Sequence, residues 1–555
     1  MSEKTDVTDL HRLMSNRGTR ARRRHGWPSG REALAVAGAA ALALALTACS
    51  SSSASAAGTS TSEPNVSHPA TATSIAVASD SAQTLVTYHY GNDRQGLDSK
   101  DASFRHIVVA WTTNSSKISG AIYAEPLIYD GMVLVVTEED DLYALNATTG
   151  AVKWKVNVGK PAQSDSVRAG PGLSGCGDIF PLGITGTPVI DATTGVLYLA
   201  AEEQAAGTSR WTGVRHVMVA VRLSDHRIVW KREIDPSHAG NGKNGTYIVA
   251  AEQQRAALSL VDGRVYVEYG GLVGDCSIYH GYVLSLPESG RGALGVYKTP
   301  SNREDAIWAT SGAAGDASGD LFVATGNGAH GPGQSFDYGD AVIKLSPSLK
   351  VMSYFAPSTW AYLNDHDLDL GSDGPTLLPG EGLLFQSGKA GYAKGHSGAK
   401  ESWGYLLNPK SLGGIGHPLF QGRVCPNAGY VFGANAAAVV TVHGAPRILV
   451  FVPCPSGTVA LSVKTGAHPS FSRIWEASQG NPNGPPIVAG GLVWAISTGA
   501  DKGGGPANIL YGMDPATGRV LVTEELAPVD HFVTPAAGDG EIVVGTTDGV
   551  EALRP

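Results

Sequence analysis

A four-strand unit that recurs along the chain constrains the fold more than any other feature of the sequence. Its clearest copy, residues 121–158, contains four runs rich in β-branched and aromatic residues, separated by Gly, Asp, Asn and Thr. These runs predict strands at 122–129, 132–138, 142–146 and 152–158. One four-stranded sheet of this size cannot cover both of its faces, so it needs neighbours of the same kind.

Similar units follow along the rest of the chain, at residues 186–234, 255–297, 308–354, 374–412, 436–477 and 485–526. Residues 534–553 hold only three strands, and the missing fourth strand lies near the other end, at residues 107–112. The pattern therefore predicts an all-β fold: an eight-bladed β-propeller over residues 85–555, closed by an N-terminal strand that completes the last blade. A solenoid is the alternative, although it needs capping repeats rather than one split repeat. Four tryptophans at equivalent places are predicted to pack between blades: Trp111, Trp154, Trp230 and Trp475.

The first 48 residues have the pattern of a secretory signal. A basic cluster at residues 20–24 precedes a run of small apolar residues, 33–48, which is shorter than the ~20 residues of a membrane span. The ending Leu46-Thr47-Ala48-Cys49 resembles a bacterial lipobox, which implies lipidation of Cys49; an ordinary signal with an incidental cysteine is the alternative. Residues 49–84, rich in Ser, Ala and Thr, predict a disordered tether. We therefore expect an extracytoplasmic protein anchored to the cell membrane through lipid on Cys49.

The charge of the chain limits its partners. The formal net charge is −9, and residues 1–48 carry eight Lys/Arg and four Asp/Glu, so removing their net charge of +4 leaves −13. An acidic body of this kind argues against nucleic acid and against anionic lipid surfaces as partners.

Four cysteines remain after Cys49, which in an exported protein suggests two disulfides. Cys425 and Cys454 are the pair closest in sequence, which would leave Cys176 with Cys276. The sequence alone allows three pairings.

The repeats also carry a family likeness. The unit endings YALNATTGAVKW and GMDPATGRVLV resemble the repeats of the quinoprotein propellers. That superfamily includes the pyrroloquinoline-quinone (PQQ) alcohol dehydrogenases and an outer-membrane assembly lipoprotein of the same fold. The likeness covers nearly all of residues 88–553 and is specific for fold. It is less specific for activity, because much of the superfamily has lost the cofactor.

The central third resembles the dehydrogenase branch, and this resemblance implies PQQ and calcium as cofactors. Thr325-Gly326-Asn327 is similar to the strand end that places an asparagine on calcium, and Glu202 falls where a calcium-binding glutamate would be. Residues 366–372 look like the segment with the catalytic aspartate, implying this role for Asp369 with Asp367 beside it. Lys389 matches a basic residue that contacts the quinone, and Trp308 the indole on which the quinone stacks.

The chemistry of these residue types is consistent with that reading. Calcium takes carboxylate and amide oxygens, a carboxylate can accept the proton of a substrate hydroxyl, and a lysine can stabilise charge on a reduced quinone. The alternatives are turn residues for Asn327, Asp367 and Asp369, and an exposed hairpin residue for Lys389. The paired adjacent cysteines of the alcohol dehydrogenases are absent from the sequence.

Three functions follow as hypotheses. The first is a membrane-tethered lipoprotein whose propeller binds a small-molecule or protein ligand at its axis without redox chemistry. The second is a PQQ- and calcium-dependent dehydrogenase of alcohols, polyols or sugars. The third is a cell-envelope assembly scaffold that acts through protein contacts.

Overall fold

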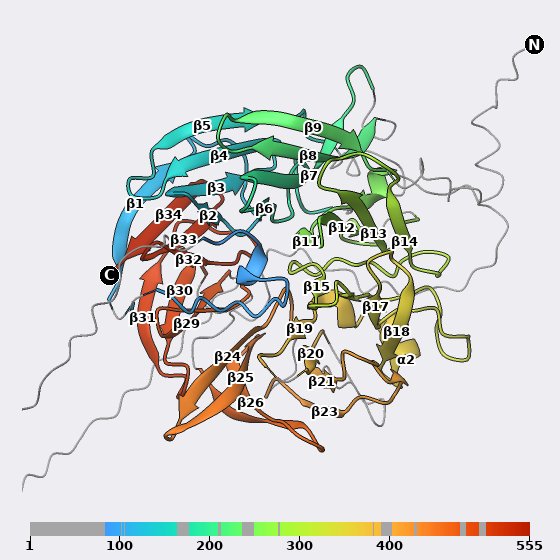
Figure 1. The fold of residues 1–555 in the computed structure, drawn as a ribbon. Helices are drawn as coiled ribbons and strands as arrows, with labels where there is room; N and C mark the ends of the chain where they lie inside the picture. The colour runs from blue at the N-terminus through green and yellow to red at the C-terminus, as the bar shows by residue number, and fades with distance from the viewer. Residues whose placement is uncertain are drawn as a thin grey trace, which may run out of the picture. The chain divides into compact units, whose positions relative to one another are not determined.

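Eight sheets of mostly antiparallel strands form the blades of a β-propeller (Figure 1). The computed structural model describes residues 84–101, 103–104, 106–163, 177–208, 213–235, 249–275, 278–380, 382–389, 402–426, 430–477, 484–498 and 507–555. All of them belong to the second of two units, Ala78–Pro555. The predicted all-β, eight-bladed fold is confirmed. The predicted signal, tether and Cys49 lie outside the described residues.

The first four blades are listed here from the innermost strand outward. Blade 1 contains β2 (Leu127–Tyr129), β3 (Met132–Val136), β4 (Asp141–Asn146) and β5 (Val152–Asn157). Blade 2 contains β6 (Val189–Asp191), β7 (Val196–Gln204), β8 (Val214–Arg222) and β9 (Arg227–Glu233). Blade 3 contains β11 (Ser259–Val261), β12 (Arg264–Gly271), β13 (Tyr282–Pro287) and β14 (Gly295–Lys298), and β10 (Glu252–Gln253) also pairs with β12. Blade 4 contains β15 (Ala314–Gly315), β16 (Leu321–Ala324), β17 (Val342–Leu345) and β18 (Val351–Ala356).

The last four blades follow the same order. Blade 5 contains β19 (Thr376–Leu377), β20 (Leu384–Gln386), β21 (Trp403–Leu407) and β23 (Phe420–Arg423). Blade 6 contains β24 (Ala436–Val442), β25 (Ala445–Cys454), β26 (Gly457–Lys464) and β27 (Ser470–Glu476). Blade 7 contains β28 (Ile487–Ala489), β29 (Leu492–Ser497), β30 (Ile509–Met513) and β31 (Val520–Glu525). Blade 8 contains β32 (Ala536–Gly538), β33 (Glu541–Thr546), β34 (Gly549–Arg554) and β1 (Val108–Asn114).

The structure differs from the predicted elements in a few places. The strand predicted at 122–129 is only β2, because Pro126 has no N–H for a ladder and belongs to the link between blades. The closing strand predicted at 107–112 is β1, two residues longer at its end. The sequence analysis also missed β22 (Gly414–Ile415), which pairs parallel with β18. It missed the short helices η2 (Tyr88–Tyr90), η5 (Val249–Ala251), α2 (Trp360–His366) and η6 (Leu370–Ser372) as well.

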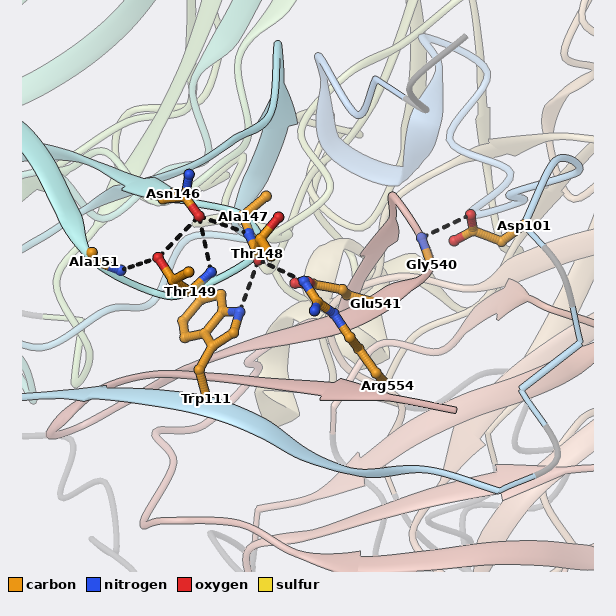
Figure 2. Close-up of polar contacts among 10 residues, drawn as sticks. All are labelled: Asp101, Trp111, Asn146, Ala147, Thr148, Thr149, Ala151, Gly540, Glu541 and Arg554. Carbon is orange, nitrogen blue, oxygen red and sulfur yellow. Dashed lines mark hydrogen bonds and ion pairs between the residues drawn. The ribbon is translucent and has the colours of Figure 1, made fainter. Parts of the chain in front are cut away.

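The ring closes by pairing the N-terminal strand with the last blade. Trp111 of β1 faces Ala552 of β34, which in turn faces Val543 of β33. Blade 8 is then tied to one turn of blade 1. Thr113 Oγ1 donates to Gly150 O at 2.6 Å, and two further donors meet at the carbonyl oxygen of Ala147 (Figure 2). Trp111 Nε1 donates to this oxygen at 2.8 Å, and Arg554 Nη2, which is ion-paired with Glu541, donates at 3.3 Å. The predicted closure is confirmed.

In several blades a tryptophan on the outermost strand packs against the following blade, as the sequence analysis predicted. Besides Trp111, the indole nitrogens of Trp230 and Trp475 donate to Glu288 O and Pro515 O of the following blade. The receiving turn holds a glycine with positive φ close to the indole: Gly150, Gly290 and Gly518. At the equivalent turn Trp154 meets a histidine instead of a glycine. Its indole stacks on the ring of His226, and the two ring centroids are 4.6 Å apart. His226 itself has a φ of 60°.

Residues 84–101, which we call the axial segment, contact the innermost strand of every blade (Figure 1, blue). In each blade the contact is made by the backbone of the second residue of the innermost strand. Amide nitrogens bond to the axial segment at Ile128, Ile190, Gly315, Leu377, Ala437, Val488 and Ala537, and the carbonyl of Leu260 accepts from Asn92. The inner edges of the sheets, which would otherwise leave backbone groups unpaired, are therefore satisfied by one continuous stretch of chain.

Arg94 is the central side chain of the axial segment. It is fully buried, and its guanidinium donates to the carbonyls of Ala313, Tyr88 and Leu258 and to the hydroxyls of Thr87 and Ser259. Five hydrogen bonds to neutral oxygens replace the water that this cation loses on folding. Arg94 thus links the axial segment to blades 3 and 4.

One disulfide joins blades 5 and 6. Cys425 follows β23 and Cys454 ends β25, with their Cα atoms 5.5 Å apart. The predicted pair Cys425–Cys454 is confirmed, whereas Cys176 and Cys276 lie outside the described residues. Among the helices that the structure describes, none has the length and apolar character needed to cross a membrane.

We expect Gly150→Ala to destabilise the ring more than Gly131→Ala. Both glycines have positive φ, 68° and 64°, so each alanine carries a backbone cost of about 1–2 kcal/mol. A Cβ on Gly150 would also lie 2.3 Å from Trp111 Cε3, which adds about 1–3 kcal/mol of overpacking, whereas nothing lies within 4 Å of one on Gly131. Urea denaturation of both variants measures the difference, and equal midpoints would contradict the docking role of Trp111.

Candidate functional site

The segments that connect one blade to the innermost strand of the next, which we call links, meet at one end of the propeller axis. We call this end the axial mouth. Arg255, Trp308, Asp369, Phe432 and Phe532 each precede the first strand of a blade, namely β11, β15, β19, β24 and β32. Because these strands all start at the same end of the axis, side chains from blades that are distant in sequence meet there.

Three half-buried aromatic rings meet at the axis. The ring centroids of Trp308 and Phe432 are 6.2 Å apart, those of Trp308 and Phe532 are 6.4 Å apart, and those of Phe432 and Phe532 are 5.2 Å apart. These spacings are typical of tilted aromatic pairs. We call Trp308, Phe432 and Phe532 the aromatic triangle.

Two cations flank the aromatic triangle. Lys389 Nζ lies 5.7 Å from the centre of the Trp308 ring, and Arg255 Cζ lies 5.0 Å from the centre of the Phe532 ring. Both distances are within the range of cation–π attraction. The mouth therefore combines apolar ring faces with positive charge on two sides.

The catalytic pair implied by the resemblance, Asp369 and Lys389, is in direct contact. Lys389 Nζ lies 2.6 Å from Asp369 Oδ2 and 2.7 Å from Asp367 Oδ1. The Lys389 side chain is only 13% exposed, so it is not the exposed hairpin residue of the alternative interpretation. Burial alone would lower the pKa of Lys389, but the charges of Asp369 and Asp367 outweigh burial and raise this pKa above its ordinary value. Lys389 is therefore a stable cation next to two carboxylates.

Asn327 is part of the same group. Its backbone N–H donates to Asp369 Oδ1 at 2.7 Å, and its own φ is not positive, so the left-handed turn proposed as its alternative is wrong. A Cβ on Gly326 would lie 2.7 Å from Asp369 Oδ1 and 3.1 Å from Trp308 Nε1. Trp308, Asn327, Asp367, Asp369 and Lys389 are thus brought together as a set.

Glu202 makes its contacts elsewhere. Its Oε1 accepts from the backbone N–H of Gln254 at 2.7 Å, and its Oε2 lies 3.7 Å from His216 Nε2. No contact of Glu202 with Asn327 or Asp369 is found among the described residues. Across the same part of the chain, no group of three or more His, Cys, Asp and Glu side chains is arranged to hold a metal ion.

A second polar group at the mouth was missed by the sequence analysis. His531 Nε2 is hydrogen-bonded to Arg255 Nη2 and lies 3.2 Å from Asp178 Oδ2, and the His531 ring meets Tyr123 edge to face. Burial would raise the pKa of Asp178, but His531 and Arg255 together hold it below its ordinary value. These residues belong to four different links. Tyr123, Arg255 and His531 each lie four or five residues before an innermost strand, whereas Asp178 lies further from β6 and carries no such sequence signal.

Three buried glutamates share one arrangement, and two of them, Glu125 and Glu252, were missed by the sequence analysis. Glu125, Glu202 and Glu252 are at most 1% exposed, and each accepts one backbone N–H through one oxygen, from His89, Gln254 and His280 respectively. The other oxygen of each has no hydrogen-bond partner among the described residues. Desolvation raises the pKa of Glu125 to about 8, with the His89 N–H and Arg94 acting in the opposite direction.

We expect Glu125→Gln to flatten the dependence of stability on pH. Because its pKa is higher in the folded state (about 8) than the ordinary 4.5, Glu125 favours folding most below pH 4.5, and this contribution is lost as the pH rises through 8. The free energy of unfolding should fall by up to about 1.4 kcal/mol per pH unit for this one group, and the glutamine variant should lose that slope. Urea denaturation between pH 5 and 9 measures it.

The exposed Glu525→Gln variant is the matched control for this prediction and should keep the wild-type slope. A Glu125→Gln protein with an unchanged slope would show that Glu125 is ionised throughout this range.

The fold of the chain and the sequence of its N-terminal half are similar to known proteins. A family model described as outer membrane protein assembly factor BamB matches residues 66–269. The protein of that name from Yersinia pestis is 36% identical over 66 residues, which are 12% of this chain and 16% of the relative. The match thus spans about a sixth of that relative's length.

Solved structures of quinoprotein dehydrogenases match most of the chain. The quinohemoprotein alcohol dehydrogenase of Comamonas testosteroni has a TM-score of 0.56 and 13% identity, covering 85% of this chain and 80% of that one. Alcohol dehydrogenase ADHIIG from Pseudomonas putida HK5 has a TM-score of 0.55 and 13% identity, with the same coverage. A europium-containing methanol dehydrogenase has a TM-score of 0.55 and 14% identity, covering 84% and 90%. At these identities the likeness shows the fold alone: this chain is an eight-bladed β-propeller.

Proposed function

We propose that this chain is an exported lipoprotein, anchored through Cys49, whose propeller binds a small ring-shaped ligand at the axial mouth. The signal pattern, the lipobox-like ending and the tether with few charged residues support the export and the anchor. The match to an outer membrane assembly factor agrees with a place in the cell envelope. The observation that carries the proposal is the aromatic triangle with Lys389 and Arg255 beside it.

The mouth matches a ligand with an apolar face and a polar edge. Half-buried aromatic rings offer flat apolar surface, while Lys389, Asp369, Arg255 and Asp178 offer donors and acceptors around it. Sites of this composition, mostly apolar with a few fixed polar groups, are typical of small-molecule binding. Sugars, polyols and aromatic carboxylates are the classes that combine these features.

We expect Trp308→Ala to weaken ligand binding about tenfold, equivalent to about 1.4 kcal/mol, because the variant lacks one ring of the aromatic triangle. Calorimetric titration with PQQ and with a panel of monosaccharides and polyols measures the affinity. Trp308→Phe, which keeps an aromatic face, is the matched control and should lose less. If no compound of the panel binds, or if Trp308→Ala binds as tightly as the wild type, the proposal is wrong and assembly through protein contacts is favoured.

A dehydrogenase is the second candidate, and the grouping of Trp308, Asn327, Asp369 and Lys389 favours it. The residues fit a flat anionic quinone, because an indole face and two cations are available at the mouth. They do not fit the implied calcium set, since Glu202 contacts Gln254 and His216 instead of Asn327 and Asp369. We therefore assign calcium no role in the chemistry of the axial mouth.

In this second candidate the residues of the chain would handle the proton. A bound quinone would supply the hydride acceptor. The carboxylate of Asp369, which is 5% exposed and paired with Lys389, would accept the proton of a substrate hydroxyl. Lys389 would orient that carboxylate through their ion pair.

If the chain is a dehydrogenase, Asp369→Asn should reduce dye-linked alcohol oxidation by the quinone-treated protein at least about 100-fold, the usual contribution of a general base. Its thermal midpoint should stay close to that of the wild type, because asparagine keeps the acceptor for the Asn327 N–H. Absence of turnover in the wild type, or unchanged turnover in the variant, would remove this candidate.

A further inference from the structure

A buried carboxylate without a partner lies next to the axial mouth. Asp305, in the link between β14 and β15, is 0% exposed, and neither of its oxygens has a hydrogen-bond partner among the described residues. An isolated charge in such a place costs several kcal/mol unless something neutralises it. An ionised Asp305 would therefore destabilise the folded protein.

A second carboxylate faces Asp305 across a glycine. A Cβ on Gly328 would lie 2.4 Å from Asp305 Oδ1 and 2.6 and 2.8 Å from the two oxygens of Asp337. Three carboxylate oxygens thus approach the same side of Gly328, and only glycine leaves room for them. Asp337 is 4% exposed, so both carboxylates are removed from water.

Among the described residues no cation forms an ion pair with Asp305 or Asp337; the charge of Asp305 acts on Lys298, where it opposes the lowering of the Lys298 pKa by burial. Asp337 accepts from the backbone N–H groups of His330 and Gly339 and from Asn364 Nδ2, all of which are uncharged donors. The neighbouring Arg303 is ion-paired with Glu304. Desolvation and then the charge of Asp337 raise the pKa of Asp305 well above its ordinary value, with a smaller opposite effect from the Ser301 hydroxyl. Either a proton or a bound cation must therefore balance the charge.

Two neutral side-chain oxygens that could complete a cation site accept from backbone N–H groups next to the pair. Asn364 Oδ1 lies 2.8 Å from the N–H of Gly328, and Ser301 Oγ lies 3.4 Å from the N–H of Ala329. Calcium prefers carboxylates combined with amide, carbonyl, hydroxyl and water oxygens. Two carboxylates with this surrounding are therefore the donor set of a hard divalent cation, whereas soft metals would require Cys or His.

We propose that Asp305 and Asp337, with Asn364 and Ser301, bind a calcium-like divalent cation between blades 3 and 4. This site is separate from Asp369 and from the calcium set implied by the resemblance. It would stabilise the segment that carries Asn327, because Asp305 N donates to Asn327 O at 2.9 Å and Glu304 forms a β-bridge with Gly328. The proposal does not depend on the ligand of the axial mouth.

The test compares thermal midpoints of chelator-treated protein with and without CaCl2 at matched ionic strength. With about 10 mM calcium, roughly ten times the weak dissociation constants of extracellular sites, we expect the wild-type midpoint to rise by about 2 °C. Asp305→Asn should abolish the rise, and Asp337→Asn is a second variant in case the first does not fold. Asp369→Asn should keep the rise, since it leaves Asp305 and Asp337 intact.

Two results would overturn the proposal. A wild-type protein without a calcium-dependent rise, together with an Asp305→Asn variant at least as stable, would show that a shared proton balances the pair. A rise that is lost in Asp369→Asn but kept in Asp305→Asn would place the cation at the axial mouth. Binding at the mouth by PQQ or sugars can be measured separately, so failure of one proposal does not decide the other.

Discussion

The fold depends on pairing the backbone groups along the inner edges of eight short sheets. Each innermost strand has only two to seven residues, from β15 to β24, and its free edge faces the axis. The axial segment bonds to one residue of each of these strands, while β1 completes the outer edge of the last blade. The ring and its centre are therefore closed by two adjacent stretches of the same chain. Unpaired edges would otherwise be costly and prone to association.

This closure also determines which residues meet at the mouth. Trp308, Phe432 and Phe532 are more than 200 residues apart at the extremes, and they become neighbours only because their links begin equivalent blades. The fixed positions of the inner strands hold these links at one end of the axis. The charged residues around them come from other links for the same reason, so the chemistry of the mouth can vary while the blades stay the same.

The fold could be predicted from the sequence because its signals are local. The alternation of short strands and turns recurs along the chain, four blades carry a tryptophan on the outermost strand, and the split last unit indicated closure. The set Trp308, Asn327, Asp367, Asp369 and Lys389 was found through resemblance, and the structure brings it together. Glu202 was wrongly grouped with that set, because its carboxylate contacts Gln254 and His216 instead. The position of a glutamate near a strand end does not determine which neighbour its carboxylate will contact.

Phe432, Phe532, Arg255 and His531 could not be predicted, because their proximity exists only across the ring. The axial segment was missed for a similar reason: its bonds run mostly through backbone atoms, which leave no side-chain pattern. This segment and β1 also affect the order of folding. Strand β1 leaves the ribosome long before β34, the strand with which it pairs, so the ring cannot close until the last strands have been synthesised. The blade that closes the ring is therefore the last part of the fold that can form during synthesis.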